Sequence, residues 1–256
     1  MPLHRMKKAW KYCTYNVPFF ILILILFGIP NHFFTELSDS NRLLLVILSF
    51  IVNSLILGYG MIITRDRING GVRLPKIMII DVLVLGIKSS IVTFIYFYIQ
   101  WVILDFVSSP LDFPVFELED MLLELPETIH MLFSHNPFDA LFFVVVGAIL
   151  FYVTTFFMEI ALARLADTGS IISAFNLLEI KKDIDIAGWR HYAKDYTFMI
   201  IAIVLFLDME YIVFPIDIIN VVLNILLELL AFVTQFLGIG AIYAEIKAKK
   251  SDSSTV

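Results

Sequence analysis

The sequence is poor in cysteine and in charged residues. Cys13 is the only cysteine, so an intramolecular disulfide is excluded, and we expect an ordinary small residue there rather than a reactive thiol. Charged residues make up 16% of the chain and hydrophobic residues 60%, whereas an average soluble domain has about 25% charged residues. This composition argues against a soluble domain. The net charge of −6 gives no reason to expect a nucleic-acid partner.

Short signatures of catalytic sites are absent as well. The chain has no Walker loop, no Gly-x-Ser-x-Gly elbow, no His-Glu-x-x-His pair and no paired aspartates inside an apolar segment. None of its five histidines falls deep within an apolar run. We therefore expect a protein that is not an enzyme, with no catalytic residues, no cofactor and no metal site.

Long apolar runs dominate what is present. There are six of them, at residues 17–34, 43–63, 86–107, 141–163, 197–213 and 218–244. Each is close to the roughly 20 residues that a helix needs to cross about 30 Å of hydrocarbon. The runs predict an all-α integral membrane protein in which six transmembrane helices form a bundle. A large soluble all-α protein is the alternative, because helices that are hydrophobic all round belong to membranes or to very large cores.

Basic residues determine the predicted topology. Of the 18 Lys and Arg residues, all but Arg42 and Lys88 lie before the first apolar run or after the second, fourth and sixth. Since loops rich in Lys and Arg stay in the cytoplasm, both termini are predicted to be cytoplasmic and the protein to lie in the cell membrane. The predicted segments are a basic N-terminus (1–16), a six-span membrane domain (17–247) with cytoplasmic loops 64–85 and 164–196 and an acidic outer loop 108–136, and a C-terminal tail (248–256).

Two cytoplasmic segments are predicted to form interfacial amphipathic helices. In residues 74–88, Asp81 and Lys88 share one helical face, and the alternative is that this segment simply begins a long third span. In residues 173–196, charged side chains alternate with aromatic ones such as Trp189. Gly188 is expected to divide that segment in two, and the alternative is a solvated connector.

The predicted outer loop is acidic and contains two histidines. His130 and His135 lie beside several carboxylates, which makes a divalent metal site conceivable. Because no ligand spacing there is diagnostic, we expect a hydrated acidic surface instead.

Polar side chains inside the apolar runs are the candidate functional residues, because a charged side chain at the centre of a membrane costs about 2.5 to 3.5 kcal/mol on insertion scales. Glu228 lies near the middle of the sixth run. The amides on its helical face or on other runs that could bond to it are Asn220, Asn224, Gln235, Asn53 and Gln100. We favour a structural role for this group, in which hydrogen bonds hold helices together, over a role in transport. Glu159 is expected to reach the interface or to pair with Arg164 or Lys88.

A set of short motifs runs along residues 43–243: Gly58-Tyr59, Arg67-Ile68 with Gly70-Gly71, Leu74-Pro75, Gly86-Ile87-Lys88, Ile95-Tyr96, Ala174-Phe175, and Gly188-Trp189 to Tyr192 after Ile184. In order and spacing they resemble the domain of unknown function 4013 family of multi-pass membrane proteins. That family occurs in archaea and bacteria, most often in archaea. The resemblance implies an integral membrane protein without an established activity. Since Gly and Pro motifs usually shape the backbone, these residues are predicted to set the helix packing.

These observations predict a non-enzymatic structural or accessory component of the cell membrane. The alternative is a small-solute or ion transporter in which Glu228 is the coupling or binding carboxylate. The expected partners are the lipid bilayer, other membrane proteins or further copies of the chain. A transporter needs a hydrated path to Glu228, whereas a structural component needs a dry, packed interior around it.

Overall fold

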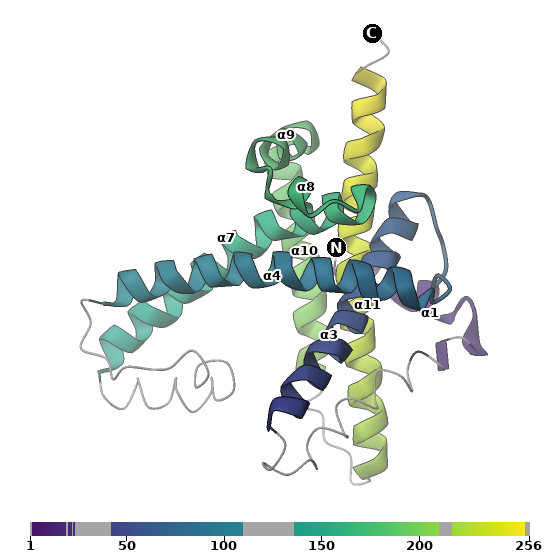
Figure 1. Ribbon diagram of the computed structural model, residues 1–256, viewed down its shortest axis with the longest axis horizontal. Coiled ribbons are helices and arrows are strands. Elements are labelled where there is room, and N and C mark those ends of the chain that lie inside the picture. The colour runs from purple at the N-terminus through teal and green to yellow at the C-terminus, as the bar shows by residue number, and fades with distance from the viewer. Residues whose placement is uncertain are drawn as a thin grey trace. The chain divides into compact units, whose positions relative to one another are not determined.

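The computed structural model describes residues 2–18, 20–21, 23, 42–109, 136–209 and 217–253 (Figure 1). The predicted first span and outer loop, with His130 and His135, lie almost entirely outside these residues. The regular structure within the described residues is helical. Its elements are α1 (Pro2–Thr14), α3 (Arg42–Ile68), α4 (Ile79–Ser108), α7 (Pro137–Thr168), α8 (Ile171–Phe175), α9 (Leu177–Ala187), α10 (Trp189–Asp208) and α11 (Asp217–Ser253).

The chain forms two compact units. The larger contains Met1–Val92 and Glu159–Val256, and the smaller contains Thr93–Met158. The beginning of α4 and the end of α7 therefore belong to the larger unit, together with α1, α3 and α8 to α11.

Helix α11 is the centre of the larger unit. It contacts α3, α10, α1 and α9, and α10 also contacts α1 and α9 (Figure 1). Leu229, Val233 and Phe236 recur on one face of α11 at helical spacing and are buried. This face of α11 therefore belongs to the core of the larger unit. Burying each large apolar side chain stabilises the folded state by about 1.5 to 3 kcal/mol.

Two glycines allow α3 and α4 to cross closely. A Cβ atom at Gly58 would collide with the carbonyl oxygen of Val82, and one at Gly86 would collide with that of Ser54. The two backbones are therefore in direct contact where these side chains are missing. Two glycines of the predicted motifs thus lie where α3 and α4 approach each other closely. That the motif residues as a group set the helix packing stays a prediction.

Helices α3 and α11 are also held together through small and polar residues. A Cβ atom at Gly60 would overlap the ring of Phe236, and one at Gly240 would lie 2.8 Å from the Cβ of Arg67. Thr64 Oγ1 donates a hydrogen bond of 3.0 Å to the carbonyl oxygen of Phe236. The buried hydroxyl thus finds its acceptor on the neighbouring helix backbone.

The smaller unit consists of the rest of α4 and α7. The rings of Phe97 and Phe151 stack there with centroids 5.9 Å apart. Gly147 has room beside it, because a Cβ atom there would have only Leu104 Cδ2 at 4.0 Å within contact range.

The predicted interfacial helix at residues 74–88 does not form as a separate element. Leu74 to Met78 are not helical, and α4 then runs without interruption from Ile79 to Ser108, which is the alternative of one long helix. Pro75 disfavours the helical conformation for the residue before it, so the helix begins beyond this turn.

The predicted second interfacial segment, residues 173–196, is divided among α8, α9 and the beginning of α10. Gly188 separates α9 from α10 as predicted, because its φ of 87° lies where only glycine is comfortable. Residues 189–196 continue directly into the long helix α10 instead of remaining in a surface segment.

Three described helices are long and apolar enough to cross a membrane. They are α4, α7 and α11, which match the third, fourth and sixth predicted runs. Helices α3 and α10 cover described parts of the second and fifth runs. Six spans and cytoplasmic termini remain predictions.

We predict that Gly58→Ala destabilises the protein, because the added methyl group has to displace the backbone of α4 at Val82. Overpacking of this kind costs about 1 to 3 kcal/mol. Gly147→Ala is the matched control, since its methyl group has room. Replacing a glycine by alanine inside a helix stabilises the folded state by about 0.5 to 1 kcal/mol, so this variant should not lose stability. Thermal unfolding in detergent measures both. Equal stability of the two variants would contradict the close crossing of α3 and α4.

Candidate functional site

A buried carboxylate connects three helices of the larger unit. Asp183 on α9 has a side chain that is 0% exposed, and its Oδ2 accepts a hydrogen bond of 2.6 Å from Arg164 Nη1 at the end of α7. Its other oxygen, Oδ1, forms an ion pair with Lys250 Nζ of α11. We call Arg164, Asp183 and Lys250 the ion cluster. A charge this deeply buried is stable only when it is paired and hydrogen-bonded, as it is here.

The ends of α9 hold Asp183 in position. The side chain of Asn176 accepts a hydrogen bond of 3.1 Å from the backbone N–H of Glu179 at the start of the helix. The backbone N–H of Gly188 donates to the carbonyl oxygen of Ile184 at 2.8 Å and closes the other end. Asp183 shares the buried face of α9 with Ile180, Ile184 and Ala187.

Three cations donate to backbone carbonyl groups at the end of α7, in the turn that follows it and in α8. Arg65 Nε donates to the carbonyl oxygen of Ala166 at 2.7 Å, and Lys88 Nζ donates to that of Gly169 at 2.6 Å. Arg164 Nε reaches the carbonyl oxygen of Ser173 at 3.0 Å. Cations at a helix C-terminus stabilise both the unpaired carbonyl groups and the helix dipole.

The motif residues support helix packing rather than one reactive centre. Tyr59 donates a hydrogen bond of 3.1 Å to the carbonyl oxygen of Pro75, which joins two motifs. Trp189 Nε1 donates to Asp185 Oδ1 at 2.6 Å. Gly70 has a φ of 85° in the turn after α3. Among the remaining motif residues, Leu74, Ala174 and Tyr192 are buried and Phe175 is half-buried. Arg67 lines the pocket described below.

Glu159 is a buried carboxylate on the apolar helix α7. It is 3% exposed, and its Oε1 accepts a hydrogen bond of 2.9 Å from Gln235 Nε2 of α11. Its Oε2 has no hydrogen-bond partner among the described residues. The predicted pairing with Arg164 or Lys88 is wrong, because Glu159 bonds to Gln235 and both cations are bonded elsewhere. Its predicted access to the interface stays a prediction.

The residues of the predicted polar group around Glu228 are distributed over several parts of the described chain. Gln235 bonds to Glu159 instead, Asn53 is exposed, and Gln100 belongs to the smaller unit. Glu228, Asn220 and Asn224 lie along α11 and are half-buried.

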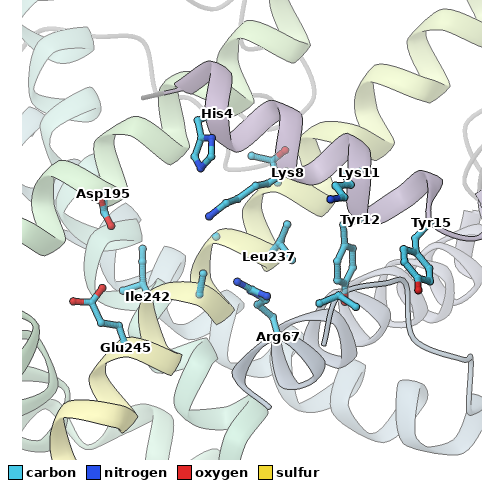
Figure 2. Close-up of a pocket in the computed structure, with 14 residues that line it drawn as sticks. His4, Lys8, Lys11, Tyr12, Tyr15, Arg67, Asp195, Leu237, Ile242 and Glu245 are labelled. Carbon is cyan, nitrogen blue, oxygen red and sulfur yellow. The ribbon is translucent and has the colours of Figure 1, made fainter. Parts of the chain in front are cut away.

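A pocket of about 800 Å³ lies between α1, α3, α10 and α11 (Figure 2). We call it the basic pocket, because His4, Lys8 and Lys11 of α1 and Arg67 of α3 line it. Figure 2 shows Lys8 and Arg67 extending into the space between α1 and α11. Sequence patterns did not predict this pocket; the only signal for it was the basic segment that precedes the first apolar run.

Helix α1 is attached to α3 beside this pocket. Tyr12 donates a hydrogen bond of 2.7 Å to Asp66 Oδ2. Burial and the Asp66 carboxylate raise the pKa of Tyr12, so the hydroxyl stays protonated and able to donate. Burial likewise raises the pKa of Cys13 to about 12. This agrees with the expectation of an unreactive thiol.

An acidic group occupies the opposite side of the pocket. Glu245 and Asp195 line it, and together with His191 they bring possible ligand atoms within 4.8 Å of one another. His191 Nε2 lies 3.3 Å from Glu245 and 3.9 Å from Asp195, and Glu245 also pairs with Lys249 at 2.8 Å. Glu245 therefore already has a cationic neighbour in Lys249.

A protein-family model matches most of the chain. The family model described as "Protein of unknown function (DUF4013)" covers residues 42–232. No curated protein and no solved structure matches the chain.

We predict that Asp183→Asn destabilises the larger unit, because it leaves Arg164 and Lys250 without their carboxylate while preserving side-chain volume. Breaking a buried ion pair from one side costs about 3 to 5 kcal/mol. Denaturant unfolding measures the loss. Lys182→Gln on the same helix is the control; it removes an exposed pair with Glu179, and we expect no measurable change. Similar losses in the two variants would show that burial of Asp183 is not what matters.

Proposed function

Because the chain belongs to the DUF4013 family of proteins of unknown function, we propose a role from its own structure: a multi-pass membrane protein without enzymatic activity that serves as a structural or accessory component of the cell membrane. We propose six spans with both termini in the cytoplasm, following the distribution of Lys and Arg. Its partners are the lipid bilayer, other membrane proteins or further copies of itself.

The observation that carries this proposal is how the polar side chains are used. The ion cluster joins α7, α9 and α11 through a fully buried carboxylate. Arg65 and Lys88 bind backbone carbonyl groups of another segment. These charged side chains bond to other parts of the protein and hold its helices together, which supports a packing role.

The apolar surface supports a membrane location. In α7, only 17% of an apolar stretch of 18 residues is buried. Phe138, Leu141, Val145 and Ile149 of that helix are exposed at helical spacing. A continuous exposed apolar face of this size requires lipid or a partner protein to cover it.

Transport remains the second candidate, and one observation favours it. Glu159 is a buried carboxylate without a cationic partner in the described part of the chain, and such residues mark ion or proton paths in many membrane proteins. It replaces Glu228 as the residue to test. Neither carboxylate lines the basic pocket, which supports the structural role for both.

We predict that Glu159→Gln preserves the protein, because a glutamine can still accept the hydrogen bond from Gln235 in the same volume. Glu159→Leu leaves the Gln235 donor without its acceptor, at a cost of about 1 to 3 kcal/mol. Thermal unfolding of both variants against a panel of ions, amino acids, nucleotides and lipids measures this, since a ligand of the native state raises its stability by mass action.

A solute that stabilises the wild type but not Glu159→Gln would support transport and contradict the structural role. Alkaline extraction of cell membranes tests the location separately. We expect the wild type and Glu159→Gln to stay in the membrane fraction, and release of the wild type would contradict a membrane-spanning protein.

A further inference from the structure

We propose that the basic pocket binds the phosphate group of an anionic phospholipid; this inference rests on the membrane location proposed above. The recognised chemistry is a phosphate ester carried by an apolar molecule. The pocket combines cations that form no ion pair with a described carboxylate, a buried hydroxyl without a hydrogen-bond partner among the described residues, and an apolar side.

The cations of the pocket are available to an anion. Among the described residues, Lys8, Lys11 and Arg67 form no ion pair with a carboxylate. Arg67 Nη1 donates to the carbonyl oxygen of Gly71 at 3.1 Å, which leaves other guanidinium donors for a ligand. Phosphate oxygens are strong acceptors for this kind of donor set.

The acidic side of the pocket does not neutralise these cations. Glu245 pairs with Lys249 and lies beside His191, and Asp195 also lies near His191. In Figure 2, Asp195 and Glu245 lie together away from Lys11 and Arg67. The side formed by α1 and α3 holds Lys8, Lys11 and Arg67 together with Asp66, whose carboxylate accepts the hydrogen bond of Tyr12. Positive charge therefore predominates on that side.

Thr234 provides an independent indication of a ligand. It lines the pocket and is 2% exposed. Its hydroxyl oxygen has no hydrogen-bond partner among the described residues. A buried hydroxyl without a partner is unfavourable. If the Thr234 side chain turns its hydroxyl toward the pocket, a ligand oxygen there accepts its hydrogen bond.

The apolar side favours a lipid as the source of the phosphate. Leu237, Ala241 and Ile242 of α11 line the pocket, and α11 is one of the helices apolar enough to cross a membrane. Trp10 on α1 is 48% exposed, as is common for aromatic residues at a membrane interface. A headgroup beside Lys8 and Arg67 would let its chains follow α11.

The test is titration of the purified protein in detergent with short-chain phosphatidylglycerol, phosphatidylcholine and glycerol 1-phosphate, read as a shift in Tm. We expect phosphatidylglycerol to stabilise the wild type. Lys8→Gln/Lys11→Gln should weaken its apparent Kd by about tenfold. The matched control is Lys7→Gln/Lys76→Gln, which removes the same charge from exposed residues outside the pocket and should bind as the wild type does.

Thr234→Val keeps the result interpretable if the lysine variants fold poorly. Without lipid we expect its Tm to match or exceed that of the wild type, because the lost hydroxyl had no partner. Its stabilisation by phosphatidylglycerol should be smaller. This combination distinguishes a ligand contact from a general loss of stability.

Each outcome decides the proposal. If glycerol 1-phosphate stabilises as well as phosphatidylglycerol and the pocket variants abolish the effect, the phosphate site stands with a soluble ester as its source. Equal stabilisation by phosphatidylcholine, equal loss in the control variant, or no shift with any probe overturns it. Alkaline extraction reports membrane location independently, so failure of the pocket is distinguishable from failure of the proposed function.

Discussion

The ion pairs of Asp183 are the constraint on which the basic end of the larger unit depends. A carboxylate that is 0% exposed cannot remain charged without its partners. Its partners come from α7 and α11, so those helices must end where Arg164 and Lys250 can reach α9. Other cations at this end bind carbonyl groups of the chain, and the short helices α8 and α9 are fixed between the long ones.

Packing and binding divide the basic residues into two groups. Arg65, Lys88 and Arg164 are bonded inside the larger unit. Lys8 and Lys11 line an open pocket. The Lys and Arg residues that determine the predicted topology therefore serve two purposes. Some bond to neighbouring helices, and others line the pocket proposed to bind a ligand. Burial separates the two groups, since a cation that has lost its water needs a fixed acceptor.

Local patterns in the sequence predicted the features that are set locally. The apolar runs anticipated α4, α7 and α11, Gly188 marked a helix boundary, and Gly58 and Gly86 marked a close crossing. Pairing between distant helices could not be predicted in this way. The acceptor of Gln235 is 76 residues away, and helical periodicity places Gln235 on a face without identifying the helix opposite.

The order in which the helices are made has a consequence for synthesis. Helix α11 packs against α1, α3, α9 and α10, yet the ribosome makes it after all of them. The hydrogen bond between Thr64 and Phe236 joins residues 172 positions apart. Such long-range contacts cannot form until late in translation. The earlier helices of the larger unit therefore lack these contacts until α11 has been made, and a product truncated before α11 would leave the faces that pack against it uncovered.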